Sequence, residues 1–223
     1  MKISNQSIGK KIRINLLKLT HHAKSSHLGS ALSIVEILTI LYNQILNKKN
    51  GDKFLLSKGH ACLALYCVLF EKKIINKNIL FSYGKNKSIL MNHVSHHVPG
   101  VIFSTGSLGH GLPVSVGLAL SSKIKKKIST TYVLLSDGEL NEGTTWEALM
   151  FASHHNLNNL CVIIDYNKIQ SLDTVSNTLA LEPLKKKFQS FGCKVFNING
   201  HNYKHLNKAL SFKQNKKPKV IIA

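Results

Sequence analysis

The second half of the chain alternates short apolar segments with helical ones, and this alternation restricts the fold more than any other feature. The apolar segments read as strands and cover 131–135, 160–164, 193–198 and 219–222. The segments between them read as helices and cover 144–155, 183–190 and 202–212. Parallel strands need long crossover connections, which are usually helices on the faces of the sheet. The pattern therefore predicts an α/β fold of three layers, a parallel sheet flanked by helices.

The first half of the chain predicts helices around one short strand. The expected helices cover 7–23, 33–45, 60–71 and 111–124, the strand covers 54–56, and a loop covers 84–110. Ser33 and Glu36 have the spacing of a capping box, which predicts that Ser33 begins the second helix. Pro183 suits the first turn of a later helix. Right-handed crossovers would place the carboxyl ends of all strands at one edge, where such sheets bind ligands.

The charge of the chain restricts its function only weakly. Lys and Arg total 30 against 10 acidic residues, and a net charge of +20 would suit nucleic acid or an anionic substrate. Arg13 is the only arginine, however, and arginine is the residue that most often reads base edges. The lysines are scattered, with short runs at 125–127 and 185–187. We therefore interpret the lysines as solvated surface, and a basic nucleic-acid-binding module is an alternative that the sequence does not favour.

Cysteine usage and hydropathy predict a reducing compartment. The cysteines show no CxxC spacing, so neither a disulfide framework nor a zinc site is expected; they are Cys62, Cys67, Cys161 and Cys193. The N-terminus has no secretory apolar region. No apolar run reaches the roughly 18 residues that would suggest a membrane span. We expect a cytoplasmic protein with no membrane partner.

Polar residues follow two of the predicted strands directly. Asp137 comes after one buried strand and Asn167 after the next, so the two should meet at one edge of the sheet. Carboxylate and amide oxygens are hard ligands that suit Mg²⁺ or Ca²⁺. Gly138 would let backbone N–H groups approach a phosphate, and Lys58 and Lys168 could attract one. An ordinary Asp-Gly turn and a solvated asparagine remain the alternative on spacing alone.

The segment 133–170 resembles the thiamine-diphosphate motif in its transketolase form. It reads DGELNEGTTWEALMFA from Asp137 onward, and Asn167 follows the next strand. Ser136 stands where the family usually has glycine, and Tyr166 replaces a frequent asparagine. The resemblance implies a thiamine-diphosphate-binding fold with thiamine diphosphate and Mg²⁺ or Ca²⁺ as cofactors. By the same resemblance the metal ligands are Asp137, Asn167 and the backbone carbonyl of Ile169.

Three further motifs of the same family occur in order along the chain. The segment KSSHLGS at 24–30 resembles a first histidine loop, LSKGH at 56–60 resembles a second, and STGSLG at 104–109 resembles the loop that wraps the cofactor rings. The resemblance implies that His27 contacts substrate hydroxyls and aids proton transfer. It also implies that His60 lies beside the cofactor diphosphate.

The resemblance assigns roles to individual residues. The implied cofactor-binding residues are His60, Gly106, Ser107, Leu108, Gly138, Glu139 and Asn167. The implied catalytic residues are His27, His60, His93 and Glu142. Glu142 matches a glutamate that transketolases bury at the subunit contact, where it links two active sites. His93 best matches a further substrate histidine, and a gap in the alignment leaves His96 and His97 as alternatives.

A full transketolase has three domains, and the resemblance covers the first of them. The second would supply the glutamate that activates the cofactor and most sugar-phosphate contacts. We therefore interpret 1–223 as a single diphosphate-binding domain, the N-terminal subunit of a split transketolase that acts only with a separate C-terminal subunit. An α2β2 heterotetramer is the expected assembly. Members of the family usually continue past the position of Ala223 through a Lys-Gly-Lys-Gly loop and a histidine, so we expect a domain cut short at its C-terminus. An inactive enzyme is the alternative if the chain truly ends there.

The implied reaction transfers a two-carbon ketol unit from a ketose phosphate to an aldose, as in pentose phosphate metabolism. The sugar donor and acceptor stay open, because their contacts would lie on the partner. The α subunit of a 2-oxo acid dehydrogenase is one alternative, but it lacks the loops of His27 and His60. A deoxyxylulose-phosphate synthase fits the DGELNEG segment poorly. A non-catalytic remnant that keeps the fold is the remaining alternative.

Overall fold

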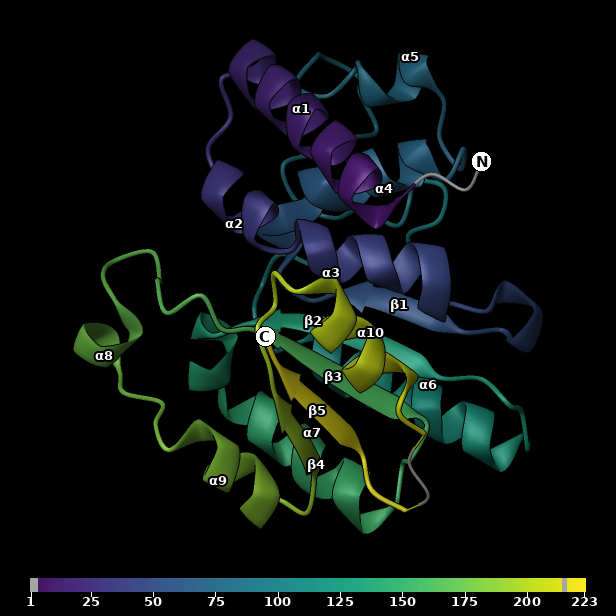
Figure 1. Cartoon of the computed structure of the whole chain (residues 1–223), viewed down its shortest axis with the longest axis vertical. Helices are drawn as coiled ribbons and strands as arrows, with labels where there is room; N and C mark the ends of the chain where they lie inside the picture. The colour runs from purple at the N-terminus through teal and green to yellow at the C-terminus, as the bar shows by residue number, and fades with distance from the viewer. Residues whose placement is uncertain (1–3, 214–215) are drawn as a thin grey trace.

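A five-stranded sheet runs through the middle of the molecule, and every pair of neighbouring strands is parallel (Figure 1). The computed structural model describes residues 4–213 and 216–223. The strands are β1 (Lys53–Leu56), β2 (Thr131–Ser136), β3 (Leu160–Asp165), β4 (Lys194–Asn197) and β5 (Lys219–Ile222). Their order across the sheet is β1-β2-β3-β5-β4, so β5 lies between β3 and β4. The predicted parallel α/β fold is confirmed.

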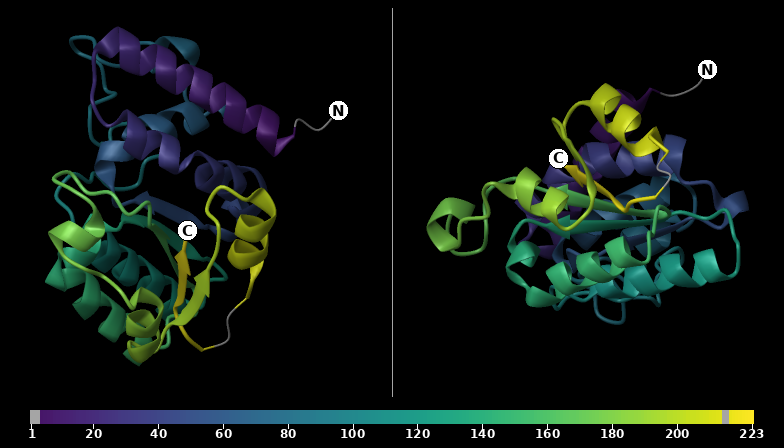
Figure 2. Two further views of the ribbon diagram at one scale, coloured as in Figure 1. Left: turned by 60° about the vertical axis from the view of Figure 1, so that its left-hand side comes forward. Right: turned by 90° about the horizontal axis from the view of Figure 1, so that it is seen from below.

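Helices cover both faces of this sheet (Figure 2). One face carries α1 (Asn5–Ala23), α2 (Leu28–Ser33), α3 (Val35–Ile40), α4 (Cys62–Glu71) and α10 (Tyr203–Ser211). The other face carries α6 (Gly111–Ile124), α7 (Gly143–His154) and α9 (Leu184–Ser190). Shorter helical segments are α5 (Lys77–Leu80), α8 (Val175–Thr178), the π-helical turn η1 (Leu41–Ile45), and the 3₁₀ turns η2 (Lys48–Asn50), η3 (Gly59–Ala61) and η4 (Gly138–Asn141).

The apolar side chains of the central strands alternate between two cores. In β2, Tyr132 and Leu134 face the core beneath α1, α3, α4 and α10, whereas Val133 and Leu135 face the core formed with α6, α7 and α9. Successive side chains of a strand point to opposite faces, and a sheet covered on both faces needs apolar residues at every position. This explains why 131–135 reads as a continuous apolar run, and it confirms the three-layer prediction.

The second predicted helix begins differently from the prediction. The predicted helix 33–45 corresponds to α3 and η1, whereas Ser33 is the last residue of α2, which begins at Leu28. Among the described residues, neither α2 nor α3 has a side-chain cap. The Ser33 hydroxyl donates to Asp165 at 2.6 Å. Glu36 forms an ion pair with Arg13 at 2.7 Å, and its Oε2 lies 3.1 Å from Nδ1 of His201, within hydrogen-bond distance. The capping-box prediction is wrong, because tertiary partners bind both side chains that the cap would have used.

The other predicted elements occur with boundaries shifted by about two residues or less, the usual uncertainty of helix ends. Pro183 is the residue just before the first turn of α9 instead of part of it. The four cysteines are buried and free. Within residues 4–213 and 216–223, no helix combines the length and apolar character that crossing a membrane requires.

Candidate active site

A cavity of about 720 Å³ lies at the carboxyl ends of β2 and β3. Ser136, which ends β2, is in register with Asp165, which ends β3. The residues that follow these strands, Asp137 and Asn167, both line the cavity, so they meet where the sequence predicted. The carboxyl edge of a parallel sheet is the usual ligand site of such folds.

The predicted site residues fall into two groups around this cavity. Those that line it are His27, His60, Leu108, Asp137, Gly138, Asn167 and Ile169. Those outside its lining are His93, Gly106, Ser107, Glu139 and Glu142. The first group comes from loops that are far apart in the sequence, so the fold alone brings them to one place.

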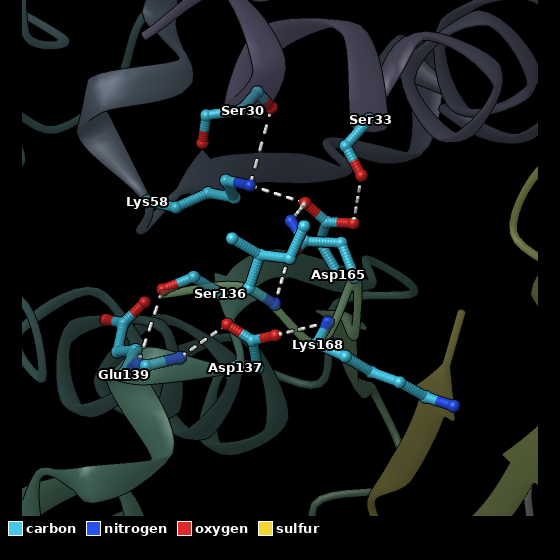
Figure 3. A network of polar contacts seen from close by, with 11 residues as sticks. Ser30, Ser33, Lys58, Ser136, Asp137, Glu139, Asp165 and Lys168 are labelled. Carbon is cyan, nitrogen blue, oxygen red and sulfur yellow. Dashed lines mark hydrogen bonds and ion pairs between the residues drawn. The ribbon is translucent and has the colours of Figure 1, made fainter. Parts of the chain in front are cut away.

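Asp137 is a buried carboxylate held in one orientation by backbone groups (Figure 3). Its Oδ1 accepts a hydrogen bond from the Gly138 N–H, and its Oδ2 accepts one from the Lys168 N–H, both at 2.8 Å. Burial raises the pKa of Asp137, although these two hydrogen bonds act in the opposite direction. A fixed, desolvated carboxylate of this kind is a favourable ligand for a hard divalent cation, because the cation supplies the missing positive charge.

Asn167 and Ile169 form a short turn beside Asp137. The Asn167 side-chain oxygen accepts from the Ile169 N–H at 3.0 Å, and its side-chain nitrogen donates to Asp165 at 3.2 Å. No group of three His, Cys, Asp or Glu side chains in the described part of the chain is placed to hold a metal. A metal here would therefore depend on a carboxylate with amide and carbonyl oxygens, the donor set that Mg²⁺ and Ca²⁺ accept.

A buried ion pair lies next to these groups, and sequence reasoning missed it. The Nζ of Lys58 is 2.5 Å from Oδ2 of Asp165, and the two side chains are 1% and 4% exposed. The prediction that Lys58 attracts phosphates from solvent is wrong, because its ammonium is buried and already paired. An aspartate at the end of an apolar strand was the only signal in the sequence that could have indicated this pair.

A second charged cluster that the sequence did not indicate lies at the cavity. Arg13 and His201 both line it. Both bind the same carboxylate, Glu36, which is 7% exposed. The Arg13 guanidinium and His201 counteract the effect of burial and hold the pKa of Glu36 below its usual value. These residues are widely separated in the sequence and carry no local motif, so only the tertiary structure could group them.

Three histidine rings gather beside the cavity. The ring centroid of His27 is 5.6 Å from that of His60 and 5.7 Å from that of His93. Burial, with the positive charge of Lys58 as a second cause, lowers the pKa of His60 to about 4. Burial and the neighbouring His93 also lower the pKa of His27. The neutral form of His60 is therefore favoured at neutral pH, and a neutral imidazole can both donate and accept a hydrogen bond.

The alternatives to His93 lie elsewhere on the same loop. His96 and His97 pack against each other, with ring centroids 4.1 Å apart. The Nδ1 of His96 is 2.7 Å from the hydroxyl oxygen of Ser104. A Cβ atom built on Gly106 would lie 3.5 Å from the ring of His93, so His93 lies beside the predicted cofactor loop.

The loop 104–109 packs tightly against the loop that carries His60. The Thr105 hydroxyl donates to the Leu56 carbonyl at 2.6 Å. A Cβ atom added to Gly59 would lie 2.5 Å from the Thr105 carbonyl oxygen, so the two backbones are in direct contact. This close approach requires glycine at position 59, and it holds the predicted ring-binding loop beside the second histidine loop.

Glu139 supports the loop 104–109 from behind the cavity. It is 0% exposed. Its Oε1 accepts from the Ser57 hydroxyl and from the Gly109 N–H, the latter at 2.9 Å, while its Oε2 has no hydrogen-bond partner among the residues that the structure describes. Burial raises the pKa of Glu139, because these hydrogen bonds compensate only part of the desolvation. The buried oxygen without a partner is the kind of group that a proton or a bound ligand would satisfy.

Glu142 precedes α7 at the surface and is exposed in the single chain. The residue after next, Thr144, donates its hydroxyl hydrogen to the Gly109 carbonyl at 2.8 Å. This bond connects the start of α7 to the loop 104–109. A buried role for Glu142 would require another chain against this surface, so that prediction stays a prediction.

Known proteins of one family match this chain along almost its whole length. The family "Transketolase, thiamine diphosphate binding domain" matches residues 4–223. A protein of Actinobacillus succinogenes that is named as one subunit of an apulose-4-phosphate transketolase is 40% identical over 224 residues, which cover 96% of this chain and 81% of that protein. The protein of the same name from Phocaeicola vulgatus is 36% identical over 222 residues, 96% of this chain and 79% of that protein.

A solved structure agrees with these sequence matches. Transketolase from Campylobacter jejuni has the same fold with a TM-score of 0.92 and 30% sequence identity, and the match covers 100% of this chain. It covers 38% of the Campylobacter chain, so this chain spans little more than a third of that enzyme. The same conclusion follows from the motif residues that line one cavity, from the matched family and from the shared fold. This chain belongs to the transketolase family and corresponds to its thiamine diphosphate-binding domain.

Proposed function

We propose that this chain is the thiamine diphosphate-binding subunit of a split transketolase, which transfers a two-carbon ketol unit from a ketose phosphate to an aldose. The observation that carries the proposal is the cavity at the ends of β2 and β3, where Asp137 and Asn167 meet His27 and His60. The two relatives described above are each named as one subunit of an enzyme, which supports the need for a second chain.

The metal site that we propose consists of Asp137, Asn167 and the backbone carbonyl of Ile169. The residues fit a hard cation, because the Asp137 carboxylate is buried, fixed by two backbone N–H groups and short of positive charge. The metal would bind the diphosphate of the cofactor, with the N-terminal end of η4 at Gly138 and the His60 ring beside it. Thiamine diphosphate would supply the nucleophilic carbon that takes up the ketol unit.

The remaining residues of the site would position groups and move protons. His27 and His93 would exchange protons with substrate hydroxyls, and burial together with the neighbouring His93 lowers the pKa of His27, which favours its neutral form. Gly106, Ser107 and Leu108 would line the cofactor rings. Glu139 would keep that loop in place through the Gly109 N–H.

The rest of the active site would come from another chain. We propose that residues 1–223 act as one diphosphate-binding domain, that Glu142 lies at the contact between subunits, and that a C-terminal subunit supplies the groups that activate the cofactor. An α2β2 assembly would bring two such pairs together. Four free, buried cysteines support a reducing compartment such as the cytoplasm.

The nature of the sugar depends on the partner as much as on this chain. The histidines described above can recognise hydroxyl groups, which all sugar phosphates share. We therefore propose a ketose phosphate as donor, with pentose phosphates or a more specialised sugar, such as the apulose 4-phosphate in the names of the relatives, as the candidates.

The proposal can be tested with the protein isolated from its own cells. Native mass spectrometry in magnesium buffer should show a complex with a second chain that carries the added mass of thiamine diphosphate and Mg²⁺. The complex should transfer ketol units, and the separated chain should not. A chain that is alone and free of cofactor, or full turnover by this chain alone, would contradict the proposal.

A substitution in the metal site provides a second test. Asp137→Ala should abolish Mg²⁺-dependent binding of thiamine diphosphate, because it removes the only carboxylate among the proposed ligands. Asp173→Ala is a matched control, since Asp173 is an exposed carboxylate outside the cavity lining, where it binds Asn177 and the Thr174 N–H. Equilibrium dialysis measures both affinities, and unchanged affinity in Asp137→Ala would remove the metal assignment.

A further inference from the structure

The buried ion pair beside the cavity connects three separate segments of the chain (Figure 3). Both Lys58 and Asp165 are buried. Lys58 also donates to the Ser30 carbonyl at 3.4 Å, and the Ser33 hydroxyl donates to Asp165 Oδ1 at 2.6 Å. Three segments therefore meet at one carboxylate: helix α2 after His27, the second histidine loop and the end of β3.

An ion pair of this kind is a poor source of net stability. Removing two charges from water has a cost that is close to, or larger than, the attraction between them. The pair instead fixes the orientation of the carboxylate, because a carboxylate with a partner on each oxygen cannot rotate freely. Asp165 has partners on both oxygens, with Ser33 on one and Lys58 on the other.

The orientation of Asp165 determines the orientation of the Asn167 amide. Oδ2 of Asp165 accepts from the Asn167 side-chain nitrogen at 3.2 Å, as well as from Lys58. A carboxylate accepts hydrogen bonds and does not donate them, so it can hold only the nitrogen end of an amide. The oxygen end of Asn167 must then point away from Asp165, where it accepts from the Ile169 N–H at 3.0 Å. An amide turned the other way would present N–H groups, which cannot bind a cation.

We propose that Lys58 is a positioning residue that acts through Asp165 to keep the oxygen of Asn167 available to the divalent cation. The inference rests on the proposed function, since it concerns the metal that would hold the cofactor. It predicts that Lys58 controls the affinity for the metal and leaves the contacts of thiamine diphosphate itself in place.

The test uses the tagged chain isolated from its own cells with any second chain that accompanies it. The metal is removed with a chelator, and Mg²⁺ is titrated back at a fixed concentration of thiamine diphosphate. Equilibrium dialysis then measures the cofactor retained. Lys58→Met should raise the Mg²⁺ concentration at half-saturation by about 10- to 100-fold, the usual effect of losing a residue that orients a metal ligand. At saturating Mg²⁺ it should retain as much cofactor as the wild type.

Lys219→Met is the matched control for burial of a lysine. Lys219 is 5% exposed, and its Nζ donates to the Ala209, Leu210 and Phe212 carbonyls at the end of α10, outside the cavity lining. It should destabilise the chain without changing the Mg²⁺ requirement. Ser33→Ala removes a single hydrogen bond from Asp165, so it keeps the test possible if Lys58→Met fails to fold, and it should shift the Mg²⁺ requirement by a smaller factor.

The outcomes separate this inference from the proposed function. Wild-type protein that retains no thiamine diphosphate at any Mg²⁺ concentration would overturn the proposed function, and the inference with it. Wild-type binding together with an unchanged Mg²⁺ requirement in Lys58→Met, or in Ser33→Ala where the first variant does not fold, would overturn the inference alone. A loss of cofactor that saturating Mg²⁺ does not restore would also overturn it, because that loss would indicate general damage to the site.

Discussion

Substitution of Gly59 by alanine should separate the two loops that form one side of the cavity. The added Cβ would lie 2.5 Å from the Thr105 carbonyl oxygen and 2.7 Å from both the Thr105 carbonyl carbon and hydroxyl oxygen. Two of these three atoms belong to the backbone, so a change of side-chain rotamer cannot remove the clash. The loop 104–109 would have to move away from η3, and the hydrogen bond from Thr105 to Leu56 would lengthen or break.

The expected cost follows from these contacts. Overpacking of a well-packed site costs about 1–3 kcal/mol. Loss of one buried hydrogen bond costs about 1 kcal/mol more. Replacement of glycine restricts the unfolded chain and returns about 0.4–1 kcal/mol. We therefore expect Gly59→Ala to lower the free energy of unfolding by roughly 1–3.5 kcal/mol, with a decrease in Tm of about 2–4 °C for each kcal/mol.

Urea denaturation of Gly59→Ala and of a matched glycine variant measures this cost. Gly117 lies in α6 and is exposed, and no neighbouring segment of the described chain comes within 4 Å of an added Cβ, so Gly117→Ala should stabilise the chain by about 0.5–1 kcal/mol. Gly59→Ala should also weaken the binding of thiamine diphosphate, whereas Gly117→Ala should not. Equal stability of the two variants would refute the argument that close backbone contact at Gly59 positions the ring-binding loop.

Three further expectations concern charge. Glu139→Gln keeps an oxygen that can accept from Gly109 and removes a buried charge. Because burial raises the pKa of Glu139 in the folded chain, thermal denaturation should show a gain in Tm at pH 7 that shrinks as the pH falls through this raised pKa and is gone below the pKa of the unfolded chain. Burial lowers the pKa of His60 from 6.5 to about 4, so the stability that its neutral form contributes is present above pH 6.5 and is lost as the pH falls toward 4. Urea titrations at several pH values should therefore show that the free energy of unfolding declines less with falling pH in His60→Gln than in the wild type. Lys58→Met should lower the free energy of unfolding by about 3–5 kcal/mol, because it leaves the Asp165 charge buried and unpaired, whereas the double variant Lys58→Met with Asp165→Leu should recover most of that loss. A double variant as unstable as the single one would contradict this account of the pair.

The local sequence was sufficient to predict those helices and strands whose formation depends mainly on their own residues. The continuous apolar runs at β2 and β3 predicted buried parallel strands because a strand covered on both faces needs apolar side chains throughout. The same reasoning predicted that Asp137 and Asn167 meet, since residues that follow neighbouring parallel strands share one edge. It was not sufficient for Ser33 and Glu36, whose spacing suits a helix cap but whose side chains bind distant partners.

The sequence by itself determined the class of fold, the edge at which ligands bind and the motifs that place the chain in its family, because these depend on periodicity and on residues close together in the chain. Only the tertiary structure decided that Lys58 is buried against Asp165, that Glu36 joins Arg13 and His201, and that Glu139 supports the loop 104–109. In each case a charged side chain would have been assigned to the surface on composition alone. The energy of a buried charge depends on partners from other segments, and chain folding alone brings those partners together.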